Sequence, residues 1–443
     1  MTGQSSGGRK GVRWFSVLIG LWLALASARA RAQVKMEFTG PGSSSAPIAI
    51  SQLKNLGGDD DGALSDRFID VLSRDVRLSG YFRIINPQSY IESPQTSGYQ
   101  LGQFNFGDWS SINAEFLVKG SVRRGDDGVT IEAFLYDVGG QRQLAGKRFQ
   151  GPPQEVPRMA RRFADALLQA VTGKRGPFDT RLAMVATQGE RFKEIYLSTI
   201  DGVGMFRVTN NPTINLSPSL DHSAGRVLYV SYKTGAPELY LYDLATRRET
   251  RIVSHLGSLL GGAVMPDGNA VVAAIERGGA TNLFMLDTAG NEIRQLTHGA
   301  SINVDPALNA DGSLMAFTSD RGGTPQIYVM STSGGAARRI TYQGDYNTNP
   351  AFSPDGSKLA YQSRKGGFQI EVISANGGGE PTHLAAGQHP SWSPDGRYIV
   401  FSSGFSGESR LYLMQADTGK IIAPITKEES NATDPAWSWW LGD

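Results

Sequence analysis

A short sequence phrase recurs through the C-terminal part of the chain. Its clearest copy runs from Asn349 to Ser363. Within it, Pro354-Asp355-Gly356 has the chemistry of a tight turn, because Pro presets φ, Asp can bond its own backbone and Gly tolerates positive φ. The residues on either side have the length and apolar content of strands. The phrase therefore predicts a two-stranded hairpin, which would be only marginally stable alone.

The copies of this phrase are evenly spaced. The aspartates of the turn, at positions 267, 311, 355 and 395, are separated by 44, 44 and 40 residues. The copy near Asp267 is weaker, with Gly262 in place of Pro, and a degenerate copy begins near Ser217. A period of about 40–45 residues with four strands per unit is typical of a β-propeller.

The number of copies of a second sequence phrase gives the number of repeat units. A three-residue apolar segment occurs six times where the third strand of each unit is expected, and five copies have an aromatic residue at the centre. The copies are Ile195–Leu197, Leu239–Leu241, Leu283–Met285, Ile327–Val329, Ile370–Val372 and Leu411–Leu413. The exception is Glu371. A short strand that ends in Leu-Thr or Ile-Thr usually follows. We therefore predict a six-bladed propeller over residues 178–443.

The two ends of the repeat array are unequal. Residues 182–186 have the pattern of a second strand, but no first strand precedes them. Residues 433–438 have the pattern of a first strand, but nothing follows them. We therefore predict that the C-terminal strand closes the ring by completing the first blade, since closure removes exposed sheet edges.

The residues before the repeats predict a small α+β domain over 46–175. Apolar residues at helical spacing predict one helix around 64–76, ended by Gly80, and another from about 156 to 172, ended by Gly173. Short apolar segments at 47–50, 81–85, 116–118, 129–136 and around 147–149 predict strands. On the second helix, Arg158, Arg161 and Arg162 favour a solvated face over a basic binding site.

The N-terminus has the pattern of an export signal. A positively charged start precedes a short apolar stretch and a small-residue cleavage site, so residues 1–32 are predicted to be removed. An uncleaved membrane anchor is the less favoured alternative, because the apolar stretch is short. We expect a mature periplasmic chain with no integral membrane segment. The chain has 0 Cys, so it cannot use disulfides.

Residues 33–45 combine a strand-competent peptide with a Gly/Ser/Pro linker. Such a peptide can add to a sheet edge in this protein or in another. It can equally be the first strand of the α+β domain, and both interpretations stay open.

Charge and motif content exclude several functions. With 43 Lys and Arg against 42 Asp and Glu, the chain offers no general attraction for nucleic acid. It contains no HExxH, Walker or GxSxG motif, and we predict no catalytic residue, metal or cofactor. Five His are scattered, and only His389 lies at a repeat position expected to line the axial opening. A lone His there more often packs or recognises a partner than binds metal.

The order of these features resembles the TolB family, the periplasmic component of the Tol-Pal system of Gram-negative bacteria. The Pro-x-Phe/Trp-Ser-Pro-Asp-Gly phrase alone also occurs in other exported propellers. The succession of signal, strand-like peptide, α+β domain and six blades is more specific, and it covers the whole mature chain.

The resemblance implies a non-enzymatic adaptor that supports outer-membrane integrity and envelope constriction at cell division. The propeller opening would bind the lipoprotein Pal, which certain bacteriocins imitate during protein import. The N-terminal peptide would bind TolA of the inner membrane. Other outer-membrane or peptidoglycan-associated proteins are further candidate partners.

Carried onto this sequence, the resemblance places Pal on the segments just before each innermost strand. These residues are Leu216, Ser217, Ser258, Leu259, Gly261, Asn303, Val304, Asp305, Asn347, Thr348, Asn349, Gln388, His389, Thr433 and Asp434. The TolA peptide corresponds to Gln33, Val34, Lys35, Met36, Glu37 and Phe38. Two positions depart from the family pattern: Ser258 stands where a His is usual, and Val304 where a Thr is usual.

The alternative is an exported propeller-type hydrolase or lyase that acts on peptide or glycan. A peptidase of this type needs a catalytic domain beyond the propeller, whereas the sequence stops at Asp443, directly after the predicted closing strand. A lyase needs clustered His and carboxylates at the tunnel mouth, where only His389, Asp305 and Asp434 qualify. We therefore favour the adaptor.

Overall fold

The computed structural model describes residues 45–59, 62–93, 95–187, 191–252, 255–404 and 408–442. All of these residues belong to one compact unit. The predicted signal peptide, residues 1–32, and the predicted TolA peptide, residues 33–38, lie outside the described residues.

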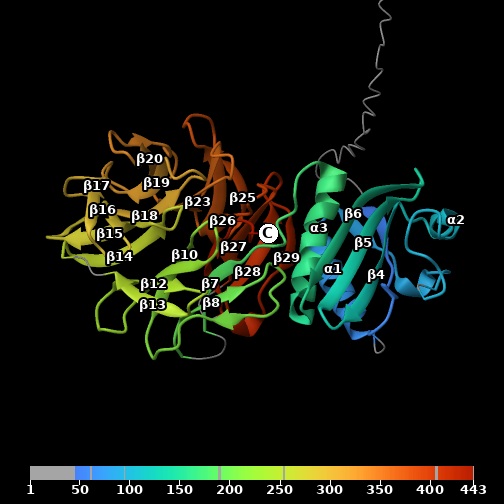
Figure 1. Ribbon diagram of the computed structural model, residues 1–443. Helices are drawn as coiled ribbons and strands as arrows, with labels where there is room; N and C mark the ends of the chain where they lie inside the picture. Colours follow the sequence, from blue (N-terminus) through green and yellow to red (C-terminus); the bar gives the residue numbers. More distant parts are fainter. Residues whose placement is uncertain are drawn as a thin grey trace, which may run out of the picture. The chain divides into compact units, whose positions relative to one another are not determined.

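The N-terminal part is a mixed sheet covered on one face by two helices (Figure 1). The strand order is β3-β1-β4-β5-β6, with β2 paired to β4, and β1 runs parallel to both of its neighbours. The strands are β1 (Ala46–Ile50), β2 (Lys54–Asn55), β3 (Phe82–Ile84), β4 (Phe116–Gly125), β5 (Gly128–Asp137) and β6 (Arg142–Gly151). The helices are α1 (Ala63–Leu78), α2 (Phe106–Ser110) and α3 (Val156–Thr172), and 3₁₀ turns span Pro87–Ser89 and Pro153–Glu155.

The two long helices begin and end for local reasons. The carboxylate of Asp59 accepts the backbone N–H groups of Leu64 and Ser65 at 2.9 and 3.0 Å, which satisfies donors that the first turn of α1 leaves open. Gly80 and Gly173 have φ of 72° and 80°, a left-handed conformation that glycine adopts without steric cost after a helix. Both predicted helix ends are confirmed. The short α2 and the parallel pairing of β1 were not predicted.

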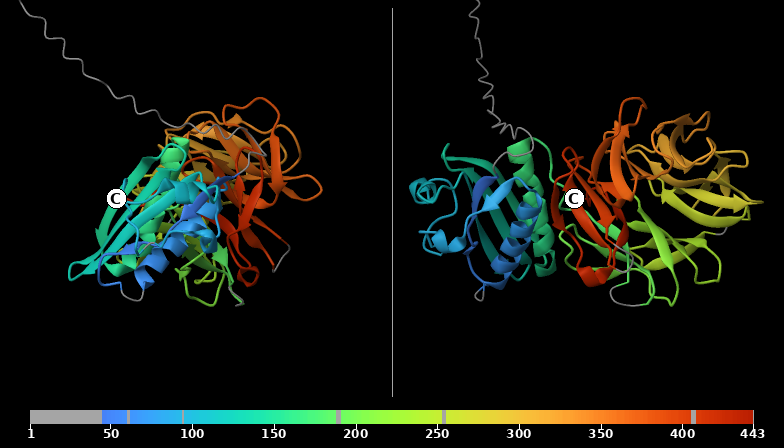
Figure 2. Two further views of the ribbon diagram at one scale, coloured as in Figure 1. Left: turned by 90° about the vertical axis from the view of Figure 1, so that its right-hand side faces the viewer. Right: turned by 180° about the vertical axis from the view of Figure 1, so that it is seen from behind.

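The C-terminal part consists of six four-stranded sheets that follow one another around a ring (Figure 2). Five sheets are continuous in sequence: β10 (Asn215–Leu220), β11 (Arg226–Ser231), β12 (Glu238–Asp243), β13 (Arg248–Ile252); β14 (Ser258–Val264), β15 (Ala270–Arg277), β16 (Ala280–Asp287), β17 (Glu292–Gln295); β18 (Asn303–Leu308), β19 (Leu314–Ser319), β20 (Gln326–Ser331), β21 (Arg338–Arg339); β22 (Asn347–Phe352), β23 (Lys358–Arg364), β24 (Phe368–Ser374), β25 (Thr382–Ala386); β26 (Gln388–Trp392), β27 (Tyr398–Ser403), β28 (Arg410–Gln415) and β29 (Ile421–Pro424). A 3₁₀ turn, Glu428–Ser430, precedes the last strand.

The remaining sheet joins the two ends of the propeller. Its order is β30-β7-β8-β9, formed by β30 (Thr433–Trp437), β7 (Leu182–Ala186), β8 (Glu194–Ser198) and β9 (Phe206–Arg207). β30 pairs antiparallel with β7, with Thr433 opposite Val185 and Trp437 opposite Leu182. The predicted closure by the C-terminal strand is therefore confirmed.

The Leu-Thr phrase holds neighbouring blades together. The Thr341 hydroxyl accepts the N–H of Ile327 at 2.9 Å and donates to Gln326 Oε1 at 2.7 Å. The Asn347 side chain, at the start of the next blade, donates to the same Gln326 oxygen at 2.9 Å. Asn282, Thr297 and Asn303 repeat this arrangement one blade earlier. Most buried polar groups of these junctions are thus paired, as burial requires, although Asn347 Oδ1 has no hydrogen-bond partner.

The helices α1 and α3 pack against the propeller beside the closing strand. Phe68 and Phe163 of the helices belong to the same apolar core as Leu182, Tyr398 and Trp437 of the propeller. The predicted solvated face of α3 is wrong at Arg161, which is buried and donates to Asp201 of the propeller at 3.0 Å. A sequence pattern cannot show which polar helix face another part of the chain will cover.

Candidate partner-binding site

Five of the six innermost strands carry the same β-bulge. In β18, Val304 pairs with Thr318 and Ala307 pairs with Ala316, so two residues oppose one residue of the partner strand. The first residue of each such bulge has φ between 51° and 53°; these residues are Ser217, Asp305, Asn349, His389 and Asp434. A proline follows each of them: Pro218, Pro306, Pro350, Pro390 and Pro435.

The residue types explain why the bulge is tolerated. Positive φ is uncommon outside glycine, and Asn, Asp and His are enriched among the exceptions. The following proline has no N–H to contribute to a strand ladder, and proline within sheets is confined largely to edges and bulges. Strained residues of this kind cluster at functional sites. The repeat therefore builds one ring of short polar side chains in a costly backbone conformation.

The position of these residues differs from the prediction in one respect. We expected the candidate segments just before each innermost strand, but the structure places them inside the first half of the strands, at the bulge. The prediction is wrong because a bulge interrupts strand pairing for two residues and then allows it to resume.

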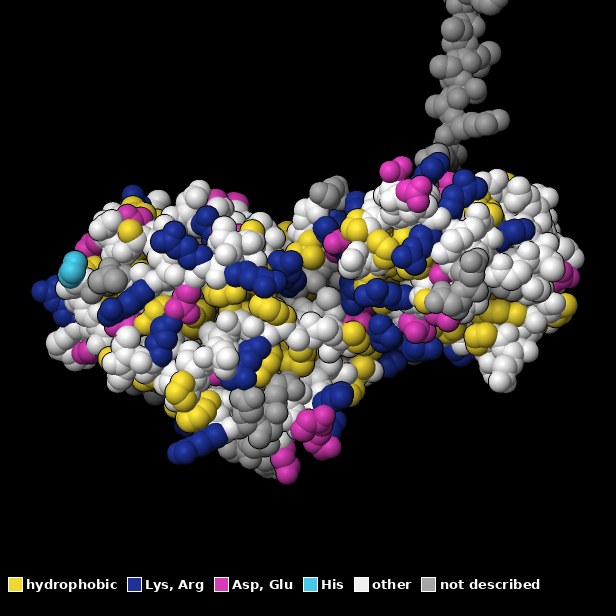
Figure 3. Space-filling view, turned by 60° about the horizontal axis from the view of Figure 1, so that its bottom comes forward, with side chains coloured by type: hydrophobic (Ala, Val, Ile, Leu, Met, Phe, Trp, Pro, Cys, Tyr) yellow, Lys and Arg dark blue, Asp and Glu magenta, His cyan; other side chains and the backbone are white. Residues whose placement is uncertain are grey.

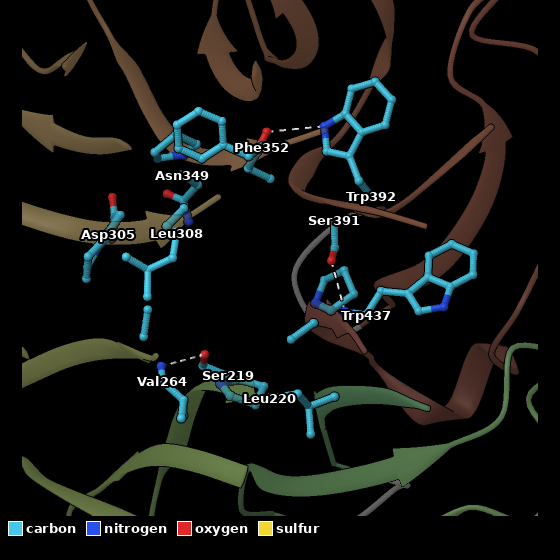
Figure 4. A pocket seen from close by; sticks show the side chains of 18 of the residues that line it. Ser219, Leu220, Val264, Asp305, Leu308, Asn349, Phe352, Ser391, Trp392 and Trp437 are labelled. Carbon is cyan, nitrogen blue, oxygen red and sulfur yellow. Dashed lines mark hydrogen bonds between the residues drawn. The ribbon is translucent and has the colours of Figure 1, made fainter. Parts of the chain in front are cut away.

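The innermost strands enclose a cavity of about 460 Å³ along the ring axis. Figure 4 shows labelled side chains from different blades arranged around it. Seven predicted residues line the cavity: Ser217, Gly261, Val304, Asp305, Asn349, His389 and Asp434. Residues from six different strands that are distant in sequence are thus brought to one axial opening.

Other predicted residues do not line the cavity. Asn303, Asn347, Leu259 and Thr348 are buried, and the two asparagines bond across blade junctions. The remaining predicted residues outside the lining are Leu216, Ser258, Gln388 and Thr433.

Two carboxylates and an imidazole line the mouth, with Asp305 on the blade opposite that of Asp434 and with His389 on the blade next to Asp434. His389 Nε2 lies 3.0 Å from Asp434 Oδ1, and His389 Nδ1 lies 3.3 Å from the Ser402 hydroxyl. Asp305 Oδ2 accepts the Thr318 hydroxyl at 2.9 Å. Burial raises the pKa of Asp305, and the Thr318 hydroxyl and the N–H of Asn349 oppose that rise. With its two carboxylates, the mouth favours a partner group that is cationic or donates hydrogen bonds.

Apolar side chains lie exposed beside the mouth. Ile214 and Ile302 immediately precede the innermost strands β10 and β18, and their exposed fractions are 46% and 49%. Leu260 of β14 and Tyr232, at the end of β11, are exposed by 39% and 37%. We call Ile214, Tyr232, Leu260 and Ile302 the apolar rim. Of these four residues, Leu260 also lines the cavity. Exposed apolar side chains beside a cavity offer contact area to a protein partner.

The sequence reasoning missed a deeper apolar belt. The cavity is lined below the bulges by Leu220, Val264, Leu308, Phe352, Trp392 and Trp437. Neighbouring inner strands are joined at this level, where the Ser391 hydroxyl accepts the N–H of Trp437 at 2.9 Å. The signal was present, since these residues occupy the apolar position of the repeated phrase.

β14 is the inner strand without the polar bulge residue. Gly261 occupies that position and Gly262 replaces the proline, and neither has positive φ. A Cβ on Gly262 would lie 2.6 Å from the Val272 carbonyl oxygen, so this backbone approach requires glycine.

Within the described residues, no group of three or more His, Cys, Asp or Glu is placed to hold a metal ion. None of the helices in the described ranges is long and apolar enough to cross a membrane.

On the face that Figure 3 shows, Lys and Arg are scattered among uncharged and hydrophobic side chains, with Asp and Glu between them.

Comparison with known proteins decides the family. A family profile described as the TolB beta propeller domain matches residues 168–441, more than half of the chain. The chain belongs to the TolB family. A second profile, the TolB amino-terminal domain, matches residues 34–144. The resemblance inferred from the sequence is thus confirmed.

Individual relatives agree with this assignment. A Tol-Pal system protein TolB from Desulfosudis oleivorans is 33% identical over 235 residues, which cover 53% of each chain. Another from Syntrophotalea carbinolica is 36% identical over 194 residues, covering 44% of this chain and 45% of that one. The chain therefore spans about half the length of these relatives. The crystal structure of TolB from Acinetobacter baumannii superposes with a TM-score of 0.76 at 26% identity, covering 89% of this chain and 97% of that chain.

Proposed function

We propose that this TolB-family chain is a periplasmic, non-enzymatic adaptor of a Tol-Pal system. It binds Pal at the propeller mouth and TolA through residues 33–38, and so supports outer-membrane integrity and envelope constriction during division. Membership of the family and the names of the relatives support the system. The proposed organisation is a signal peptide over 1–32, a binding peptide and linker over 33–45, an α+β domain over 46–175 and the propeller over 178–443.

The observation that carries the proposal is the mouth itself. Five blades each present a polar side chain from a strained bulge to one opening, and the apolar rim stands beside it. Protein interfaces combine an apolar centre with polar groups that set orientation. A ring of this kind offers a docking surface to a folded partner rather than a pocket for a small substrate.

The alternative, a propeller-type hydrolase or lyase acting on peptide or glycan, finds less support at this site. The mouth brings together His389, Asp434 and Asp305, but His389 is already paired with Asp434 and Asp305 with Thr318. An assay of the mature protein against peptide and glycan substrates separates the two functions. Turnover that is lost in a His389→Ala variant would favour the enzyme.

Charge reversal at the mouth tests the Pal site. Asp305→Lys and Asp434→Lys place a cation where a docked partner would be desolvated, and mismatched charge at an interface can cost several kcal/mol. We expect affinity for the soluble domain of Pal, measured by calorimetry, to fall at least tenfold. Circular dichroism checks that each variant is folded.

The matched control is Glu292→Lys, an exposed acid on the outer strand β17. It makes the same change in net charge away from the mouth, so it should bind Pal as the parent does. Parent-like binding by both mouth variants would place the Pal site elsewhere.

The TolA site is tested by deleting residues 33–38. We expect the deletion to abolish binding of the TolA domain while Pal binding persists. Affinity for TolA is then measured with and without saturating Pal, because a mouth that controls exposure of the peptide would show reciprocal coupling of about 1–3 kcal/mol. Equal affinities would leave the peptide as an independent site, and retained TolA binding by the deletion would remove its role.

A further inference from the structure

Two arginines of the α+β domain hold one aspartate of the propeller. Arg74 of α1 donates from Nε to Asp201 Oδ2 at 3.0 Å, and Arg161 of α3 donates from Nη2 to Asp201 Oδ1 at 3.0 Å. Arg161 Nη2 also donates to the Thr199 hydroxyl at 3.0 Å. The Asp201 side chain is fully buried. Both helices are therefore pinned to the turn that follows β8.

A second carboxylate lies beside this contact without a partner. Asp75 of α1 is 0% exposed, and neither of its carboxylate oxygens has a hydrogen-bond partner. The Nε of Arg161 is also buried and has no acceptor. An ionised carboxylate buried without a partner is costly, so the arrangement around Asp75 suits its neutral form.

We propose that Asp75 is a proton-dependent switch for docking of the α+β domain onto the propeller. While Asp75 is protonated, Arg161 stays paired with Asp201, and the α+β domain remains docked on the propeller. When it ionises, Asp75 competes for the free Nε of Arg161 and draws the guanidinium away from Asp201, which loosens the contact. The device does not depend on which partners the protein binds.

The charged groups that face Asp75 come from three elements. They are Arg74 on α1, Arg161 and Asp165 on α3, and Asp201 in the turn after β8. Burial raises the pKa of Asp75 well above its usual value; Arg161 opposes the rise, while Asp201 and Asp165 reinforce it.

Asp201 behaves in the opposite way. Burial alone would raise its pKa, but Arg161, the Thr199 hydroxyl and Arg74 together hold it below the usual value. Asp201 is therefore an ionised anchor, whereas burial raises the pKa of Asp75 and also raises that of the neighbouring Asp165, to about 8. The Asp75→Asn variant separates the two, because it removes only the titration of Asp75.

The sign of the pH dependence follows from linkage. The docked state holds a proton on Asp75 that the undocked state, with an ordinary carboxyl pKa near 4, has released. The contribution of Asp75 to docking is therefore fully present below about pH 4 and is lost as pH rises through the raised pKa of docked Asp75. Within that window the undocked fraction should grow by up to about tenfold for each pH unit.

A distance measurement tests the switch. The chain has 0 Cys, so Arg67→Cys on α1 and Lys420→Cys, between β28 and β29, allow two spin labels to be attached specifically. Both positions are exposed. We expect the interspin distance distribution of the labelled full chain to be narrow at pH 5 and to gain a longer, broader component as the pH rises to 8.

Two variants are expected to hold the domains in the docked or the undocked state at every pH. Asp75→Asn keeps the shape of the neutral acid, so its distribution should stay narrow at every pH. Asp201→Asn weakens the anchor, so its distribution should be broad at every pH. Asp70→Asn, an exposed acid on the same helix, is the matched control and should follow the parent.

Three outcomes would overturn the proposal. They are a parent distribution that does not change with pH, an unchanged pH dependence in Asp75→Asn, or a narrow distribution in Asp201→Asn. Thermal unfolding provides a second readout, because the melting temperature of Asp75→Asn should exceed that of the parent by more at pH 8 than at pH 5.

Discussion

The blade that joins the two ends of the propeller differs from the blade beside it, although both are built from the same repeat. Trp437 of β30 and Trp392 of β26 occupy equivalent positions and are equally buried, each 8% exposed. Trp392 donates from Nε1 to the Ala351 carbonyl of the preceding blade at 3.2 Å. Trp437 donates to the hydroxyl of Thr180, in the segment that leads in from the α+β domain, at 2.9 Å.

Their apolar surroundings differ in the same way. Trp392 belongs to a core confined to the two neighbouring blades, whereas Trp437 belongs to the core that continues into α1 and α3. Ring closure and domain docking therefore share one set of buried contacts. One repeat position can thus serve blade packing alone in one sheet and domain assembly in another.

Removing the closing strand should have the largest effect. A chain ending before Thr433 loses β30, so β7 becomes an unpaired edge and the shared core is opened. Loss of a single large buried aromatic costs about 3–5 kcal/mol, and the truncation removes more than that. We expect loss of the cooperative thermal transition. Melting at the parent temperature would contradict the role of β30.

Substituting the two tryptophans separates closure from blade packing. Trp437→Ala and Trp392→Ala should each lower the free energy of unfolding by about 3–5 kcal/mol. We expect only Trp437→Ala to increase hydrogen exchange in α1 and α3 as well, because only Trp437 packs in their core. Equal exchange of these helices in both variants would remove the distinction between the two blades.

A smaller contrast concerns two equivalent turns. Asp395 pairs with Arg397 at 2.9 Å, and Arg397 donates to the Lys174 carbonyl at 3.1 Å, at the end of the α+β domain. Among the described residues, Asp355, in the same turn one blade earlier, bonds within its own turn, to Ser353 and Ser357. Asp395→Ala should cost about 1.5–3 kcal/mol and Asp355→Ala about 1 kcal/mol, as measured by chemical denaturation. A larger cost for Asp355→Ala would reverse the comparison.

The smallest expected effect is the pH dependence of the stability that the Asp355 turn contributes. The hydroxyl of Ser353 and the N–H of Ser357 lower the pKa of Asp355 to about 2. A lowered carboxyl pKa stabilises the fold above about pH 4, and this contribution is lost as pH falls toward 2. Asp355 is exposed, so the effect should stay below about 1 kcal/mol. The difference in melting temperature between the parent and Asp355→Asn should therefore become smaller as the pH falls from 5 to 2. A difference that does not change with pH would contradict the stabilising role of ionised Asp355.

Much of the architecture could be predicted from the regular spacing of the repeated sequence phrases. The turn aspartates, the third-strand phrase and the unpaired strands at 182–186 and 433–438 led to six blades closed by the C-terminus, and the structure confirms them. Spacing works here because each blade repeats one local pattern that tight turns specify. The exception at Glu371 was visible but unexplained, and the structure shows its carboxylate bonded to Tyr361 and Lys365.

The candidate site was predictable in outline but not in geometry. The polar residue before each inner-strand proline could be named, but its positive φ depends on pairing with the next strand. The contact between His389 and Asp434 joins residues that are adjacent only because the ring is closed. The burial of Asn303 and Asn347 likewise depends on the neighbouring blade.

The amino-acid sequence alone specified the repeat, the turns, the helix ends and the strand that closes the ring, because each depends on residues near one another or on simple periodicity. The tertiary structure decided which polar faces are covered. Arg161 was indistinguishable from a solvated arginine until α3 was seen against the propeller, and Asp75 became notable only as a buried carboxylate without a partner. The physical reason is that desolvation and charge pairing depend on distances between residues far apart in the chain, and no local pattern encodes those distances.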